Sequence, residues 1–108
     1  MRKKSISEEI QIQVDKIVDD FNKQIIKTKQ YSYKTRFKGE YLYLDRIEYG
    51  NPNPICRLRY NGKINNWGFA IYKYSVNGYD SDEWFFPGSE HINGTIEGAM
   101  KAVLEAYP

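Results

Sequence analysis

The stretch "YSYKTRFKGEYLYLDRIEY", residues 31–49, decides the fold. Its first part has the period-two alternation of a half-buried strand. The residues expected on one side of that strand are Tyr31, Tyr33, Thr35 and Phe37. A tight turn is predicted at residues 38–40, and residues 41–49 predict a second strand. Because the connection is so short, the two strands are expected to form an antiparallel hairpin.

The pattern continues toward the C-terminus with further strands. Residues 55–60, 67–75 and 83–86 are rich in aromatic and aliphatic residues and predict three more. Between them, "GNPNP" at 50–54 predicts a loop, because proline cannot donate a hydrogen bond to a neighbouring strand. The segment "VNGYDSD" at 76–82 predicts a turn. All connections are short, which favours a meander.

Helical periodicity frames these strands. Residues 6–28 repeat apolar side chains at steps of three and four, which places them on one face of a helix: Ile10, Val14, Ile17, Val18, Phe21 and Ile25. A second helix follows Thr95, which can cap it. Gly98 inside that helix should cost about 1 kcal/mol relative to alanine, unless close packing requires a small residue.

The predicted fold is therefore α+β: an N-terminal helix, a four- to five-stranded antiparallel meander and a C-terminal helix. Both helices are expected on one face of the sheet. With 108 residues, a single domain spanning 1–108 is predicted, with residues 1–5 flexible. No apolar stretch is long enough for a membrane span. Cys56 is the only cysteine, which excludes an internal disulfide and favours the reducing cytoplasm.

Charge is unevenly distributed along the chain. The net charge is +2, but residues 31–75 carry eight Lys/Arg and three Asp/Glu, whereas residues 76–108 carry one and six. The middle of the chain is therefore basic and the C-terminal third acidic. Such a separation can steer an encounter with a charged partner.

Catalytic and metal-binding motifs are weak. A metal site would need several histidine or cysteine ligands, or a calcium loop, and neither pattern occurs; no metal and no cofactor are predicted. Cys56 and His91 are the only pair for nucleophilic catalysis, and Cys56 is expected in the core. The acids Glu40, Asp45 and Glu48 lie on or beside strands without special context.

The open face of the sheet is the better candidate. If the helices cover the face bearing Phe37, Leu42, Leu44, Leu58, Trp67, Phe69 and Ile71, tyrosines and basic residues occupy the other. This candidate binding face comprises Lys34, Arg36, Tyr41, Tyr43, Arg57, Arg59, Tyr72 and Tyr74. The side-chain pattern of the second strand is inconsistent along its length, and a bulge near Asp45 or Arg46 would reconcile it.

The favoured hypothesis is a small non-enzymatic binding module of the adaptor or inhibitor type. It would bind a protein partner, or a second copy of itself, through this face, because tyrosine and arginine are enriched at protein interfaces. The alternative is a single-stranded nucleic-acid binder, in which rings stack bases and cations meet phosphates. A second alternative is an enzyme that uses carboxylates or His91.

Overall fold

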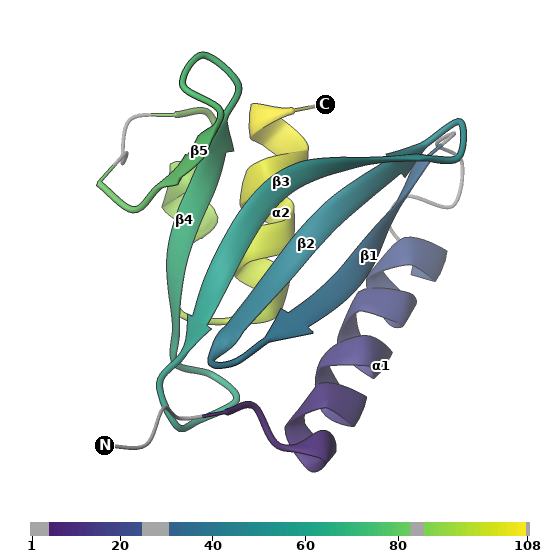
Figure 1. The fold of residues 1–108 in the computed structure, drawn as a ribbon, viewed down its shortest axis with the longest axis vertical. Coiled ribbons are helices and arrows are strands. Elements are labelled where there is room, and N and C mark those ends of the chain that lie inside the picture. Colours follow the sequence, from purple (N-terminus) through teal and green to yellow (C-terminus); the bar gives the residue numbers. More distant parts are fainter. Residues whose placement is uncertain (1–4, 25–30, 83–85, 108) are drawn as a thin grey trace.

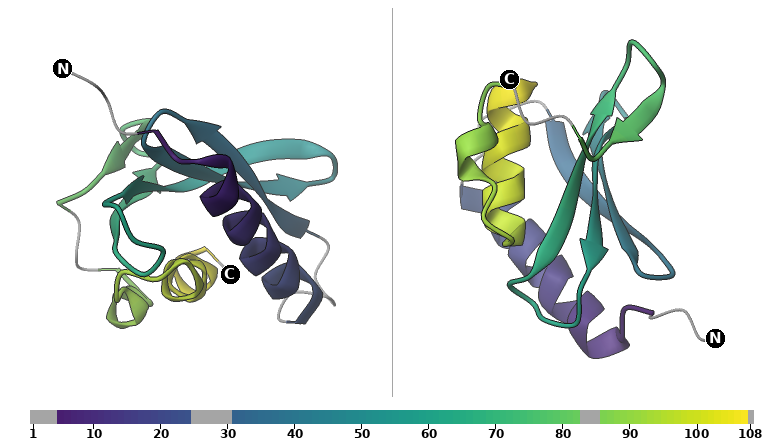
Figure 2. Two further views of the ribbon diagram at one scale, coloured as in Figure 1. Left: turned by 90° about the horizontal axis from the view of Figure 1, so that it is seen from below. Right: turned by 90° about the vertical axis from the view of Figure 1, so that its left-hand side faces the viewer.

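A five-stranded antiparallel sheet carries both long helices on one of its faces (Figures 1 and 2). The computed structural model describes residues 5–24, 31–82 and 86–107. The strands pair in chain order, as a meander does. The elements are α1 (Glu8–Gln24), β1 (Tyr31–Lys38), β2 (Tyr41–Glu48), β3 (Asn51–Tyr60), β4 (Trp67–Lys73), β5 (Gly78–Asp80), the 3-10 helix η1 (Ser89–His91) and α2 (Ile96–Ala106). The predicted α+β architecture is confirmed.

The predicted hairpin of β1 and β2 is present. Phe37 pairs with Leu42 and Thr35 with Leu44, so the predicted inward-facing positions share one face. On β3 and β4 the same face receives further large apolar side chains, and together these strands and the helices form the core. Its sheet-derived members include Tyr33, Leu42, Leu44, Leu58, Trp67, Phe69 and Ile71. Phe37 is only partly buried against this core.

A bulge lies opposite Leu44 and Asp45, but its extra residue is on β3, whereas the prediction placed the bulge in the second strand, which alternates without a break at Asp45 and Arg46. Leu44 pairs with Cys56, whereas the next residue, Asp45, pairs with Pro54, so Ile55 has no partner on β2. Both Ile55 and Cys56 are buried. Two successive inward side chains are possible only because the bulge breaks the alternation. Beyond it, Arg46 faces inward and Ile47 pairs with Pro52.

The prediction of a loop at residues 50–54 is wrong, because β3 already begins at Asn51. Pro52 and Pro54 both lie within the strand, paired with β2. However, β4 pairs only with the part of β3 from Cys56 onward. The first half of β3 is therefore an edge on its other side, where a strand tolerates residues that lack an N–H donor.

The fifth strand lies earlier than predicted. It spans Gly78–Asp80, inside the segment expected to be a turn, and pairs with the end of β4. Of the segment predicted as a strand, residues 83–85 lie outside the described residues, and Phe86 belongs to no strand. The sequence did not predict β5 because the strand has only three residues and has glycine and aspartate at its ends. Tyr79 is its only residue with a high strand propensity.

The first helix, predicted at 6–28, begins two residues later than predicted. It buries Val14, Val18 and Phe21 and begins at Glu8. Residues 25–28 of the prediction, like most of the segment 1–5 expected to be flexible, lie outside the described residues. No helix among the residues described is both long and apolar enough to cross a bilayer.

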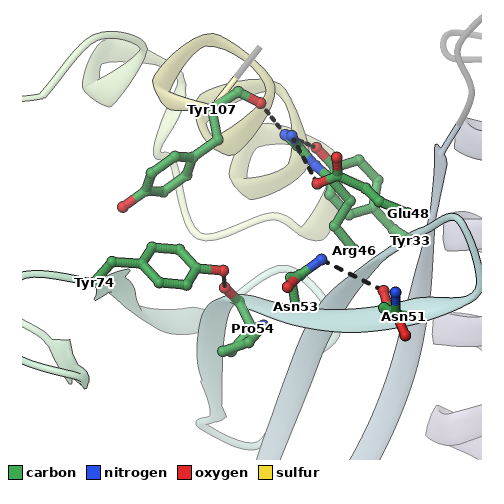
Figure 3. Close-up of polar contacts among 8 residues, drawn as sticks. All are labelled: Tyr33, Arg46, Glu48, Asn51, Asn53, Pro54, Tyr74 and Tyr107. Carbon is green, nitrogen blue, oxygen red and sulfur yellow. Dashed lines mark hydrogen bonds and ion pairs between the residues drawn. The ribbon is translucent and has the colours of Figure 1, made fainter.

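A buried arginine ties α2 to the sheet (Figure 3). Arg46 of β2 is only 5% exposed and donates hydrogen bonds to the Tyr107 carbonyl oxygen and to the Tyr33 hydroxyl, 3.2 Å away. Its guanidinium also lies 3.7 Å from the Glu48 carboxylate. A carbonyl at a helix C-terminus has no partner within the helix, and a cation is favourable there. Arg46 therefore fixes the end of α2 over β2.

The start of α2 is capped as predicted. The Gly98 N–H donates to Thr95 Oγ1 over 3.0 Å. Gly98 itself is buried, and a Cβ at this position would overlap the His91 carbonyl oxygen and lie 2.5 Å from Asn93 Oδ1. The glycine is thus required because the η1 loop folds tightly against the first turn of the helix.

We expect Gly98→Ala to destabilise the fold, although alanine normally favours a helix. Overpacking of this kind should lower the free energy of unfolding by about 1–3 kcal/mol. The matched control is Gly68→Ala in β4, where the nearest atom to a new Cβ would be Arg59 Cβ at 3.6 Å. That control should stay within about 0.5 kcal/mol of wild type in urea unfolding. A Gly98→Ala protein as stable as wild type would contradict the packing argument.

Candidate binding face

Four tyrosine rings form a line across the face of the sheet that the helices leave open. The rings of Tyr41 and Tyr43 lie 6.2 Å apart, and Tyr43 meets Tyr79 at 5.5 Å. Tyr79 in turn contacts Tyr72 at 5.0 Å, with the ring planes at 76°. Centroid separations of this size are those of favourable aromatic pairs. The line runs from β2 to the far edge of the sheet at β5.

Two guanidinium groups lie against these rings. The Arg36 Cζ atom is 4.4 Å from the Tyr43 ring centroid. The Arg57 Cζ atom is 4.6 Å from the centroid of Tyr41 and 5.3 Å from that of Tyr79. Each such contact contributes about 0.5–1 kcal/mol at an exposed site. We call this set the tyrosine–arginine ladder: Arg36, Tyr41, Tyr43, Arg57, Tyr72 and Tyr79.

Strand register explains why these residues meet. Tyr43 of β2 pairs with Arg36 on one side and with Arg57 on the other. Tyr72 of β4 pairs with Tyr79 of β5. Directly opposed residues on one face of an antiparallel sheet have neighbouring side chains. The ladder is thus a consequence of the meander and of its register.

Of the eight residues predicted for this face, five belong to the ladder. Lys34 also lies on this face, paired with Asp45 and exposed. Arg59 lies opposite Tyr41 and forms an ion pair with Glu40, with 3.3 Å between Nε and Oε2. Tyr79 was missed, because residues 76–82 were predicted to form a turn. Its neighbours, Gly78 and Asp80, give no polar–apolar alternation that could have revealed the strand.

Tyr74, the last predicted member, lies where the sheet ends. It follows β4, and its ring contacts both Tyr72, at 4.9 Å, and Tyr107 beyond α2, at 5.9 Å. Its hydroxyl donates to the Pro54 carbonyl oxygen over 2.8 Å (Figure 3). Burial raises the pKa of Tyr74 above its ordinary value. Tyr74 therefore connects the ladder to the end of α2.

The carboxylates considered for catalysis are each bound to an arginine. Asp45 accepts hydrogen bonds from Arg36, Glu40 pairs with Arg59, and Glu48 lies beside Arg46. The bond from Arg36 to Asp45 raises the pKa of this arginine, and Arg36 stays protonated. The structure thus places these three acids as ion-pair partners of the sheet arginines.

The proposed nucleophile and base are not brought together. Cys56 is fully buried in the core, and burial raises the pKa of its thiol far above the ordinary range. His91 instead lies 3.2 Å from Glu105 and 3.9 Å from Glu90. These three side chains form a cluster within 4.8 Å that sequence analysis missed, since Glu105 follows His91 by a whole helix. The contact between His91 and Glu105 connects η1 to α2 at the surface.

The two sides of the molecule carry opposite charge. The open sheet face and its margin present five basic side chains and two acidic ones: Lys34, Arg36, Lys38, Arg57, Arg59, Glu40 and Asp45. The helices carry the opposite excess, with five acids and two lysines in α1 and two acids and one lysine in α2. The basic middle of the sequence thus forms the sheet face, whereas the acidic excess of the helical layer comes mainly from α1 and less from the acidic C-terminal third.

A scan of protein-family models and searches of curated proteins and of solved structures gave no match to this chain.

The environment of Tyr79 predicts a loss of stability at high pH. Burial raises its pKa, although hydrogen bonding to Arg36 opposes the shift. A raised pKa means that folding favours the neutral phenol, so this stabilisation is complete below the unfolded pKa and is lost as the pH rises through the folded one. Tyr79→Phe should reduce the loss of unfolding free energy between about pH 8 and about pH 10.5, measured with urea. Tyr49→Phe, at an 83% exposed tyrosine, is the matched control, and an equal effect of both changes would contradict the assignment.

Burial of Cys56 predicts that it is chemically silent in the folded protein. At about pH 8, the native thiol should not react with a disulfide reagent such as Ellman's, whereas one thiol per chain should react after unfolding in guanidinium chloride. Rapid labelling of the native protein would show that the Cys56 thiolate is accessible and would support a role for Cys56 as a catalytic nucleophile.

Proposed function

We propose that this protein is a non-enzymatic binding module, of the adaptor or inhibitor type, that binds a protein partner through the tyrosine–arginine ladder. The observation that carries the proposal is the ladder itself, on a sheet face that no described helix covers. Tyrosine and arginine are the residues that most often dominate the energetics of protein interfaces. We further propose a cytoplasmic location, where a lone reduced cysteine is ordinary.

Rigidity of the ladder supports this function. Each ring is held by another ring or by a guanidinium, and Arg36 is fixed in addition by two hydrogen bonds to Asp45, of 3.1 and 3.3 Å. Side chains that are already ordered lose little conformational entropy on binding. A face with fixed rings and fixed cations is therefore suited to a partner of defined shape.

Single-stranded nucleic acid is the alternative ligand, and the ladder suits it less well. Bases stack on free ring faces. Here the Arg36 guanidinium covers one face of the Tyr43 ring, and Arg57 lies over Tyr41. Two of the five basic side chains of the open face, Arg36 and Arg59, are also paired with carboxylates. Fluorescence anisotropy with short RNA and DNA oligonucleotides should show no binding at low salt; salt-sensitive binding lost on Arg57→Ala would favour this alternative.

The central test compares partner capture by wild type, Tyr43→Ala and Tyr49→Ala. Each protein is immobilised at equal density and exposed to lysate from its own source. Any captured protein is then purified, and its dissociation constant is measured against all three. Loss of Tyr43, at the centre of the ladder, should weaken binding about tenfold or more. Tyr49→Ala removes an exposed tyrosine from the β2–β3 turn and should bind as wild type does.

Thermal unfolding of the three proteins verifies that the fold is intact. Sedimentation equilibrium of the free protein tests the variant of this proposal in which the partner is a second copy. A purified partner that binds wild type and Tyr43→Ala equally well would overturn the proposed use of the ladder.

A further inference from the structure

A shallow hollow lies beside the ladder, between β2, β3 and β4. Its volume is about 210 Å³, and it is lined by Tyr41, Arg57, Arg59, Gly68, Phe69, Ala70 and Ser81. Two guanidinium groups thus border one small depression on the open face. Ser81, which follows β5, adds a hydroxyl to its lining.

The hollow follows from which residues face each other across β3 and β4. Arg57 pairs with Ala70 and Arg59 with Gly68, so each arginine lies opposite one of the two smallest residue types. A Cβ added at Gly68 would make an ordinary van der Waals contact with Arg59 Cβ, at 3.6 Å, so the strand has room for a methyl group at this position. Larger residues at these positions would fill the hollow.

The Arg57 guanidinium lies between two tyrosine rings. Its contacts are the rings of Tyr41 and Tyr79, and no carboxylate of the described residues pairs with it. These two contacts restrict the position of the guanidinium, and its N–H groups make no hydrogen bond to the described residues. A planar group with parallel N–H donors matches a carboxylate or a phosphate in two-point hydrogen bonding.

Local charge distinguishes between these two anions. Arg59 is already paired with Glu40, 3.3 Å away, so that pair is nearly neutral. Arg57 is then the one basic lining residue of the hollow without an acidic partner among the residues described. A single positive charge complements a carboxylate, whereas the Glu40 carboxylate nearby repels a phosphate dianion more strongly.

We infer that the hollow is a subsite for the carboxylate of an aspartate or glutamate side chain, presented by an acidic segment of the protein partner. This inference rests on the proposed function, since it names the chemistry of the partner at one point of the ladder. The excess of basic side chains on the open face favours such a segment over its whole length. Arg57 is the anion-binding residue, and Tyr41 and Tyr79 position it.

The test is an NMR titration with N-acetyl-glutamate amide as the probe. It should shift the Arg57 Nε–Hε signal and the backbone amides of Gly68 and Ala70 saturably. N-acetyl-glutamine amide has the same shape without the charge and should bind about tenfold more weakly, the value of one charge-assisted hydrogen bond. Methyl phosphate should not bind more tightly than the glutamate probe.

Four variants separate the subsite from general electrostatics. Arg57→Gln removes the donor and should abolish the response, and Arg57→Lys keeps the charge without the planar fork and should weaken it. Gly68→Val keeps both guanidinium groups but fills the hollow, and it should also block binding. Lys63→Gln removes one charge from the exposed β3–β4 turn, outside the candidate binding face, and is the matched control, with wild-type binding expected.

The outcomes separate this inference from the proposed function. Three results would each overturn the subsite. They are absence of a saturable response in folded wild type, tighter binding of methyl phosphate, and equal losses for Lys63→Gln and Arg57→Gln. A partner whose affinity depends on Tyr43 but not on Arg57 or Gly68 would leave the binding module standing without it. Probe binding does not require the partner, so the subsite can be confirmed even if capture fails.

Discussion

One unpaired residue in β3, Ile55, decides what each face of the sheet displays. It separates two stretches of β3 that pair with β2 in different registers. After the bulge, Cys56 and Leu58 face the core, and Arg57 and Arg59 face outward. Before the bulge, Pro52 and Pro54 pair with the outward residues Ile47 and Asp45 of β2. Without the extra residue, one half of the strand would present its side chains to the wrong face.

Unbroken alternation along β2 places Arg46 on the inward side with Leu42 and Leu44, and this solves a second problem. The C-terminus of α2 has carbonyl groups without helical partners, and Arg46 supplies donors from the sheet. The burial of this arginine is tolerated because Tyr33, Glu48 and Tyr107 surround its guanidinium with acceptors. Placement of α2 thereby becomes linked to the pairing of β2 with β3, and both helices stay on one face while the ladder stays open.

Sequence periodicity was enough to predict the helices, the hairpin and most inward residues, because each reflects local alternation between core and solvent. It failed where the outcome depends on neighbours distant in sequence. Pro52 and Pro54 predict a loop, because proline disrupts a strand that is paired on both sides. The sequence does not show that β4 pairs with β3 only from Cys56 onward, which leaves the prolines at an edge. Tyr79 was hidden in a turn-like segment, and Glu105 meets His91 only because α2 folds back on η1. The sequence predicted that five of the ladder residues share the open face. It did not predict that two guanidinium groups lie over the tyrosine rings.

Those ring–guanidinium contacts give the open face two properties at once. Exposed tyrosines on a sheet invite nonspecific association, and cations lying over the rings cover part of that apolar surface. The same contacts hold the rings and the N–H donors in place before any ligand arrives. A partner that brings a carboxylate to Arg57 would add hydrogen bonds at the guanidinium edge without displacing the stacking. Solubility of the free protein and readiness to bind therefore arise from one arrangement of side chains.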